Sequence, residues 1–219
     1  MQENSESPVR SGDSLWAAIA ATLSGNIYLI VGTLVFSTLA LAVCWLPPRG
    51  RWVFRVARLW SRGVLLSSGV RLRTSFETEL DSRASYVYIA NHQSLFDIPA
   101  LIAGAPGETR FMAKHSLFQI PLFGWALKAG GFVSIDRKSQ GRSRAGFASA
   151  LRELRSGASV LIFPEGTRSL DGRLLPLKRG GILLALRSGL PIVPVGIRGT
   201  LEIRSRRSYL IHPGSAELH

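Results

Sequence analysis

The chain has 219 residues, enough for one α/β domain with an appendage, and its 27 Lys and Arg against 14 Asp and Glu give a formal net charge of +13. This basic charge could attract anionic lipid or phosphorylated substrates, but no motif for reading nucleic acid accompanies it, so we expect no nucleic-acid partner. The single cysteine excludes an internal disulfide, and the four histidines stand too far apart in the sequence to predict a metal site.

The N-terminal part of the chain predicts a membrane anchor. A polar tail over residues 1–13 precedes residues 14–48, which contain no charged side chain. Residues 27–46 alone supply the roughly 20 apolar residues that a bilayer-crossing helix needs. Because the whole segment is longer than one untilted span, and Gly25 and Asn26 could divide it, we expect either one anchoring helix or a hairpin. The acidic tail and the long apolar segment argue against a cleaved signal peptide.

Residues 49–69 predict a basic amphipathic helix. Arg51, Arg55, Arg58 and Arg62 recur at helical spacing on one face, and apolar and tryptophan side chains fill much of the remainder. Such a helix suits a membrane interface, with its arginines on lipid phosphates and its indole rings at headgroup level. The alternative is a helix that packs on the protein's own domain. By the positive-inside rule, the arginines predict that this end of the membrane segment lies in the cytoplasm.

Residues 70–219 predict an α/β domain. Helical patterns at Arg142–Ser156 and Lys178–Ser188 lie among short apolar runs. This alternation predicts a largely parallel mixed sheet flanked by helices, with a ligand site outside the carboxyl ends of its strands. The strand-like runs lie near residues 70–74, 85–90, 109–113, 131–135, 159–163 and 192–197.

His92 and Asp97 follow one of these apolar runs and have the layout of a general base with an orienting acid. An imidazole can accept a hydroxyl proton at neutral pH, and a nearby carboxylate can fix its tautomer and stabilise the imidazolium. No Gly-x-Ser-x-Gly motif accompanies the pair, so the pattern favours a substrate hydroxyl as nucleophile. The alternative is structural: Asp97 caps a helix, as the N-cap or in a capping box with Ser94, and His92 is an ordinary turn residue.

A second polar loop follows a later apolar run. Pro164 ends that strand because it has no N–H to donate to a sheet. Gly166 permits a positive φ and close approach of a ligand, Thr167 offers a hydroxyl, and Arg168 offers a planar fork of donors suited to phosphate. The loop therefore predicts a phosphate cradle. The alternative is a solvent turn in which Glu165 pairs with Arg168.

Five sequence blocks occur in one order along the chain: Asn91–Asp97 with its His-x4-Asp pattern, Phe111–Trp125, Gly131–Arg137, Phe163–Ser169 and Ile192–Val195. Together they resemble the glycerolipid acyltransferase family, specifically its bacterial 1-acylglycerol-3-phosphate acyltransferase type. The resemblance covers roughly residues 70–213. An ordered set of blocks is far more specific than either motif alone.

The resemblance implies a reaction and a catalytic pair. His92 would deprotonate the free hydroxyl of 1-acylglycerol-3-phosphate, Asp97 would orient His92, and the hydroxyl would attack an acyl thioester to form phosphatidic acid in phospholipid biosynthesis. The donor substrate would be acyl-coenzyme A or acyl-carrier protein, with no bound cofactor and no metal. The implied location is the bacterial inner membrane, with the catalytic domain of residues 70–219 facing the cytoplasm.

The resemblance also implies substrate-binding residues. The acceptor's phosphate would be held by Arg137 and by the loop of Glu165, Gly166, Thr167 and Arg168. Lys114 would face either a phosphate or the developing oxyanion. Pro194 would help to place the acyl chain or the donor.

Two alternatives to this function stay open at the level of sequence. The acceptor could be another lysolipid, such as lyso-ornithine lipid, or glycerol-3-phosphate itself. The chain could also be a catalytically silent protein that binds anionic lipid through its basic surface.

Overall fold

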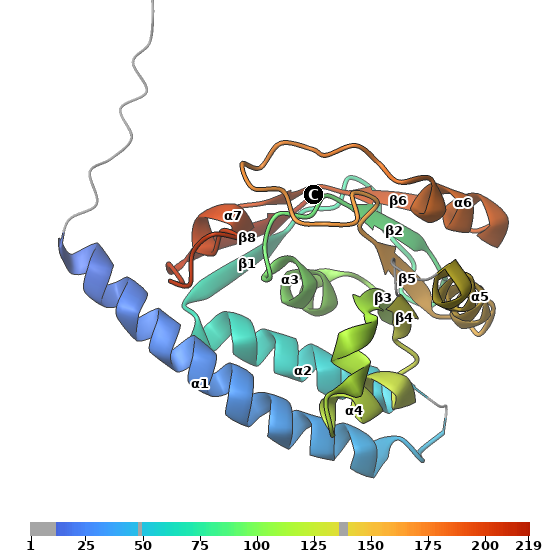
Figure 1. Ribbon diagram of the computed structural model, residues 1–219, viewed down its shortest axis with the longest axis horizontal. Helices are drawn as coiled ribbons and strands as arrows, with labels where there is room; N and C mark the ends of the chain where they lie inside the picture. Colours follow the sequence, from blue (N-terminus) through green and yellow to red (C-terminus); the bar gives the residue numbers. More distant parts are fainter. Residues whose placement is uncertain (1–11, 48–49, 136–139) are drawn as a thin grey trace, which may run out of the picture.

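Five parallel strands form the central sheet of the protein, in the order β4-β3-β5-β2-β6 (Figure 1). The computed structural model describes residues 12–47, 50–135 and 140–219. The sheet confirms five of the predicted strands, because its members are β2 (Val87–Ala90), β3 (Thr109–Lys114), β4 (Val133–Ile135), β5 (Ser159–Ile162) and β6 (Ile192–Val195).

The sixth predicted strand, β1 (Val70–Thr74), belongs to a separate sheet of three strands. It pairs in parallel with β8 (Gly214–Leu218), and β8 pairs antiparallel with β7 (Ile197–Arg198). The α/β fold with a mainly parallel sheet is confirmed, but its strands are divided between two sheets. The split places β7, and the residues that follow it, beside the carboxyl edge of the larger sheet (Figure 1).

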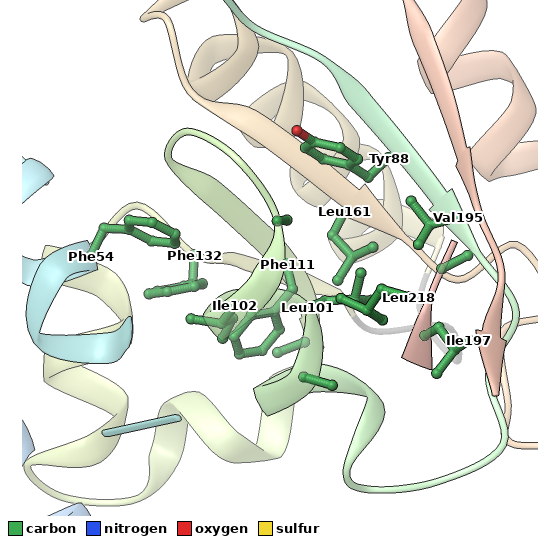
Figure 2. Packing of buried hydrophobic residues seen from close by; sticks show 14 of the residues in the cluster. Phe54, Tyr88, Leu101, Ile102, Phe111, Phe132, Leu161, Val195, Ile197 and Leu218 are labelled. Carbon is green, nitrogen blue, oxygen red and sulfur yellow. The ribbon is translucent and has the colours of Figure 1, made fainter. Parts of the chain in front are cut away.

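Helices cover both faces of the five-stranded sheet, as the short apolar strands require. Side chains alternate between the faces: Val87 and Val160 pack with α5 (Gln140–Arg155) and α6 (Arg179–Ser188). Tyr88 and Leu161 point the other way, into the larger core shown in Figure 2. The helices on that side are α2 (Arg51–Ser67), α3 (Asp97–Gly104), the 3-10 turn η1 (His115–Gln119) and α4 (Phe123–Ala129); the short α7 (Thr200–Ile203) follows β7.

The N-terminal segment forms one continuous helix, α1 (Gly12–Val43), so the hairpin alternative is not what the structure shows. Within the described residues it is the one helix long and apolar enough to cross a membrane. It lies along α2 and against α4 (Figure 1). Hydrogen bonds fasten it to the domain, from the Ile211 N–H to Thr22 Oγ1 at 2.8 Å and from Ser24 Oγ to the Ser67 carbonyl at 2.6 Å. The predicted tail over residues 1–13 lies outside the described residues except for its last two.

Helix α2 packs on the domain, which was the alternative to an interfacial helix. Its buried face carries Phe54 and Val64, among others. Arg58 does not reach outward, because its guanidinium donates to the carbonyls of Ile102, Ala105 and Gly107 at 3.1, 2.7 and 2.8 Å. The remaining arginines of the predicted stripe, Arg51, Arg55 and Arg62, are exposed, and Arg51 pairs with Glu108 at 2.9 Å.

Candidate active site

Two loops meet at the carboxyl edge of the five-stranded sheet, as the strand pattern predicted. Strands β2 and β5 are parallel neighbours, so the turn after Ala90 and the turn after Ile162 leave the sheet side by side. The backbone N–H of His92 donates to Glu165 Oε1 at 2.7 Å, and the Ser169 N–H donates to the His92 carbonyl at 2.8 Å. The two motifs are therefore parts of one site.

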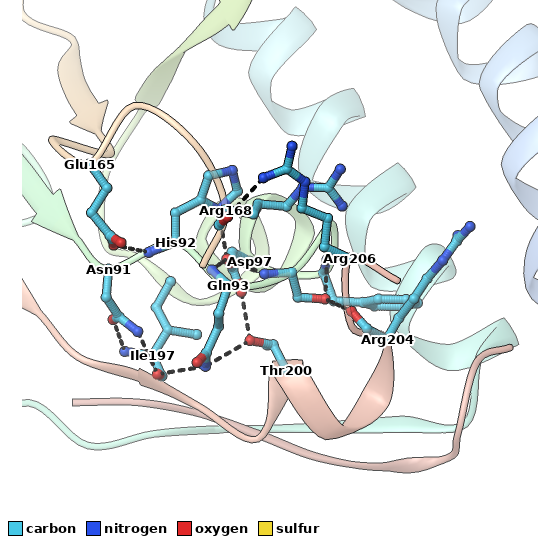
Figure 3. A network of polar contacts seen from close by, with 12 residues as sticks. Asn91, His92, Gln93, Asp97, Glu165, Arg168, Ile197, Thr200, Arg204 and Arg206 are labelled. Carbon is cyan, nitrogen blue, oxygen red and sulfur yellow. Dashed lines mark hydrogen bonds and ion pairs between the residues drawn. The ribbon is translucent and has the colours of Figure 1, made fainter. Parts of the chain in front are cut away.

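His92 and Asp97 form a direct pair within the first turn (Figure 3). The distance between His92 Nδ1 and Asp97 Oδ2 is 2.7 Å, and the Asp97 side chain is fully buried. A carboxylate can only accept, so Nδ1 carries the proton of this hydrogen bond and Nε2 keeps its lone pair. The imidazole is thus presented as a base through Nε2, the nitrogen that Asp97 does not use.

Both carboxylate oxygens of Asp97 accept hydrogen bonds. Its Oδ2 also accepts from the backbone N–H groups of Gln93 and Ser94, at 2.7 and 2.9 Å, and its Oδ1 accepts from Thr200 Oγ1 at 2.6 Å. These donors compensate a buried negative charge that would otherwise be costly. Asp97 is the first residue of α3 and Phe96 is its N-cap, so Asp97 is not the predicted N-cap. Its hydrogen bond from the Ser94 N–H is the one that the capping-box alternative predicted, and it exists together with the pairing to His92.

The imidazole of His92 lies against a flat aromatic surface. Its ring is stacked on Phe163, with centroids 4.0 Å apart and planes inclined by 18°. The His92 side chain is 16% exposed, so it is held by its neighbours yet open on one side. Asn91 ties the preceding backbone to β7, because its side chain donates to the Ile197 carbonyl and accepts from the Ile197 N–H, at 3.0 and 2.7 Å.

Glu165 joins the two loops rather than facing outward. Its buried carboxylate accepts from the His92 N–H through Oε1 and from the Leu175 N–H through Oε2, the second at 3.0 Å. The solvent turn with a Glu165–Arg168 ion pair is therefore not formed. Gly166 has a φ of 74°, in the left-handed region that glycine adopts readily, which agrees with its predicted backbone conformation.

The other predicted site residues are not all next to the His92–Asp97 pair. Thr167 is exposed and Arg168 is half-buried, in the loop whose Ser169 N–H bonds the His92 carbonyl; Figure 3 shows Arg168 beside His92 and Asp97. Lys114 is exposed at the carboxyl end of β3, which β5 separates from β2. Pro194 is exposed on the edge strand β6, where a missing N–H is tolerated. Arg137 lies outside the described residues.

Sequence reasoning missed a third contribution, from the segment after β7. Thr200 bonds Asp97, Arg206 Nη1 donates to Thr167 Oγ1 at 3.3 Å and to the Arg168 carbonyl at 3.4 Å, and the Arg204 carbonyl accepts from Ser94 Oγ at 2.8 Å. Thr200 begins a helix of only four residues, which produces no periodic signal. The available signal was a cluster of polar and basic residues directly after the last apolar run.

Two cavities flank the turn that carries His92. A polar cavity of about 280 Å³ is lined by His92, Gln93, Glu165 and Arg173, among others. An apolar cavity of about 510 Å³ lies between α1, α2, α3 and α4, and Leu95 and Phe96 of the same turn contribute to its wall. The cavities share no lining residue, so the turn separates a polar space from an apolar one.

The fold and the site together define the class of protein. It is an α/β protein in which a histidine is paired with a buried carboxylate beside an apolar cavity. In the part of the chain that the structure describes, no group of three or more His, Cys, Asp or Glu side chains is arranged to hold a metal ion.

Comparison with known proteins gives the family. The family model described as "Acyltransferase" matches residues 71–198, more than half of the chain, and the chain belongs to that family. A chloroplastic 1-acyl-sn-glycerol-3-phosphate acyltransferase of Brassica napus is 42% identical over 118 residues, which are 53% of this chain and 34% of that protein. The human 1-acyl-sn-glycerol-3-phosphate acyltransferase alpha is 31% identical over 163 residues, which are 74% of this chain and 58% of that protein.

The matched segments span less than two thirds of these relatives. A solved structure extends the agreement over the whole fold: the 1-acyl-sn-glycerophosphate acyltransferase of Thermotoga maritima superposes with a TM-score of 0.80 at 23% identity. That match covers 94% of this chain and 85% of that one, so it includes the N-terminal helix as well as the sheets.

Proposed function

We propose that the protein transfers an acyl chain from an acyl thioester to the free hydroxyl of 1-acylglycerol-3-phosphate, forming phosphatidic acid. The observation that carries this proposal is the His92–Asp97 pair, 2.7 Å apart at the strand edge of a domain that belongs to the Acyltransferase family. The names of the similar plant and human proteins support the choice of acceptor.

His92 acts as the only proton carrier in this scheme. Nε2 takes the proton of the acceptor hydroxyl while its oxygen bonds to the thioester carbonyl carbon. The imidazolium is stabilised by Asp97, whose charge is held by Thr200 and two backbone N–H groups. The carbon–sulfur bond then breaks, the thiolate leaves, and the proton on Nε2 passes to sulfur. A thioester is already activated, so a base worth ~10²–10⁴-fold and correct orientation of both substrates suffice.

The loop after β5 contributes in two ways. Glu165 positions His92 by binding its backbone N–H, a role that suits a carboxylate better than contact with an anionic phosphate. Arg168 and Thr167 present a guanidinium and a hydroxyl beside the pair and would hold the phosphate. Arg137 is proposed to assist them. Lys114 and Pro194 are proposed, on the resemblance alone, to act on phosphate or oxyanion and on acyl or donor placement.

The apolar cavity suits an acyl chain. About 510 Å³ is the size of a small-molecule site, and its walls are almost entirely aliphatic and aromatic. It lies between the proposed anchor helix α1 and the helices α2 and α4 that pack against α1. A chain lying there would have its reactive end near the turn that carries His92.

The proposed domain organisation and location are supported by α1. We propose that residues 14–48 associate with the membrane through the apolar face that α1 leaves exposed, with residues 49–69 beside it and residues 70–219 as the catalytic domain. The inner membrane of a bacterium, with the domain on its cytoplasmic side, agrees with the positive-inside rule. The donor is acyl-coenzyme A or acyl-carrier protein, and the basic surface suits both, because both are negatively charged.

The test is an acyl-transfer assay on detergent-solubilised protein with 1-acylglycerol-3-phosphate, two other lysolipids and both thioester donors. Transfer to the phosphate acceptor is expected, and it should disappear in His92→Ala. Transfer to another lysolipid alone would contradict the proposed acceptor while keeping the mechanism. No transfer with any pair of substrates would contradict the proposed reaction.

A further inference from the structure

Three arginines from two distant parts of the chain lie near the His92–Asp97 pair: the side chains of Arg168 and Arg206 run together, and that of Arg204 extends to one side of them (Figure 3). Arg168 belongs to the loop after β5, and Arg204 and Arg206 follow α7. Arg206 reaches the loop directly, through its hydrogen bonds to Thr167 Oγ1 and the Arg168 carbonyl. Arg204 is fixed by its backbone, because its carbonyl accepts from Ser94 Oγ and its N–H donates to the Thr200 carbonyl at 3.1 Å.

The positive charge at this place is not neutralised by the protein. Among the described residues, none of the three guanidiniums forms an ion pair with a carboxylate. Asp97 is the nearby acid, and its oxygens are already engaged by four donors. The pKa of Arg168 is lowered by burial and by the nearby charges of Arg206 and Arg204, against an opposing effect of Asp97, as expected where cations lie close to one another. An anion bound among them would relieve this repulsion.

Arg204 also connects this group of arginines with the apolar cavity. It is the one charged residue among those that line the cavity, whose other walls include Leu95, Phe96 and Ile211. A ligand that places an apolar chain in this cavity can therefore place an anionic group on Arg204. The arrangement fits an amphiphile whose negative charge lies at one end.

We infer that Arg204 and Arg206 complete, with Arg168, a three-guanidinium site that selects a lipid ending in a phosphate monoester over one carrying a phosphodiester. A phosphate monoester has a charge of about −1.5 to −2 at neutral pH and three terminal oxygens that accept hydrogen bonds. A phosphodiester has a single negative charge, and one of those three oxygens carries a second substituent. Three cationic forks match the first headgroup better than the second. This inference rests on the proposed function and assigns the acceptor specificity of that site to residues outside the recognised sequence blocks.

Binding, measured apart from turnover, tests the inference. Calorimetry on detergent-solubilised wild-type protein would compare 1-acylglycerol-3-phosphate with 1-acylglycerophosphoglycerol, a diester with the same chain. Arg204→Ala and Arg206→Ala should each weaken monoester binding by about 10- to 100-fold, the range expected for loss of a charge-assisted hydrogen bond, and should affect the diester less. Arg207→Ala, which removes an exposed arginine from the same segment, should bind both lipids as the wild type does.

Two further readouts separate charge recognition from a structural effect. Inorganic phosphate has no acyl chain and can bind only through its charge. It should therefore compete with the monoester in the wild type and should compete no longer in Arg204→Ala. Arg204→Lys should recover part of the affinity, and in turnover assays Arg204→Ala should raise KM for the acceptor with little change in kcat. The backbone bonds of Arg204 are kept in these variants, so the fold is expected to remain.

The binding and turnover results distinguish failure of the three-guanidinium site from failure of the proposed reaction. Equal binding of both lipids by the wild type, or losses in Arg204→Ala and Arg206→Ala no greater than in Arg207→Ala, would overturn the three-guanidinium site even if the wild type transfers acyl chains. Selective, arginine-dependent binding of the monoester without acyl transfer would uphold the site and contradict the proposed reaction.

Discussion

Thr200 donates a hydrogen bond of 2.6 Å to Asp97 Oδ1, although 103 positions separate them in the chain. Through this bond the segment after β7 supports the carboxylate that orients His92. Gln93 joins the same network, since its side-chain amide donates to Thr200 Oγ1 at 3.1 Å. The His92–Asp97 pair is thus held by its own turn and by a segment about 100 positions later in the chain.

Replacing Thr200 by valine should therefore reduce both stability and turnover. The substitution keeps the shape but leaves Asp97 Oδ1 buried without its donor, and a hydrogen bond to a charged group contributes about 1.5–3 kcal/mol. We expect the free energy of unfolding to fall by about this amount and kcat to fall with little change in KM. Denaturant unfolding and steady-state kinetics measure the two effects. Thr200→Ser, which retains the hydroxyl, should restore most of both; a loss as large as that of valine would refute the assignment.

His92→Ala should lower turnover by about 10²–10⁴-fold, the contribution of a positioned base. Asp97→Asn should also lower kcat, because an amide can donate toward Nδ1 and so favours the wrong tautomer. His219→Ala is the matched control, since this histidine is exposed and its imidazole pairs with Glu217, away from His92. Activity in His92→Ala equal to that of the control would exclude the base mechanism.

Glu165→Gln should impair kcat more than acceptor KM. The carboxylate accepts from two backbone N–H groups, of His92 and Leu175, whereas a glutamine side chain offers only one accepting oxygen. One buried N–H is left unpaired, which costs about 1–3 kcal/mol and frees the backbone of His92 to shift. Kinetics beside the exposed-site control Glu77→Gln measure the effect. A change confined to KM would instead favour direct contact between Glu165 and substrate.

The exposed face of α1 is predicted to bind the membrane. Ile27, Val31 and Val35 lie on successive turns, and each is more than half exposed in the structure. Complete burial in lipid would contribute about 1.5–3 kcal/mol per side chain, so changing all three to glutamine should release the protein from vesicles. Vesicle sedimentation measures binding. The control changes three exposed leucines outside α1, namely Leu183 and Leu186 on α6, which lies away from α1 (Figure 1), and Leu174 in the loop before α6. Equal release by both triple variants would contradict an anchor specific to α1.

Arg58→Met should destabilise the fold although Arg58 resides in a predicted lipid-facing stripe. The methionine keeps the apolar stem but withdraws the donors of three carbonyls at the end of α3. We expect the free energy of unfolding to decrease by at least about 1.5–3 kcal/mol, the value of one hydrogen bond to a charged group. Arg62→Met, at an exposed position of the same helix, should change it little. Thermal or denaturant unfolding of both variants decides whether Arg58 acts within the protein.

The sequence predicted those features that depend on local patterns. Strands were found because short apolar runs recur, and His92 and Glu165 were placed together because both follow parallel strands. Helix α5 was expected at Arg142–Ser156 and occupies Gln140–Arg155; α6 was expected at Lys178–Ser188 and occupies Arg179–Ser188. These are shifts of one or two residues, within the usual uncertainty of helix ends.

The features that sequence reasoning missed depend on contacts between distant residues. The separation of β1 into a second sheet is determined by its pairing with β8, near the end of the chain. The direction of Arg58 depends on the free carbonyls of α3, which no helical periodicity reveals. The roles of Thr200, Arg204 and Arg206 likewise depend on the position of β7, which hydrogen bonds between Ile197 and Asn91 hold beside the turn of His92. In each case the local pattern allowed two outcomes, and tertiary packing selected one.

The hydrogen bonds of Arg58 have a consequence for how the enzyme would work on a bilayer. They join α2 to the last turn of α3, whose first residue is Asp97, while α1 lies along α2. Direct contacts therefore link α1, through α2, to the helix that begins with Asp97. If α1 binds the membrane as proposed, these contacts would hold the His92–Asp97 pair at one depth below the lipid headgroups, and the acceptor would be taken from that level of the leaflet.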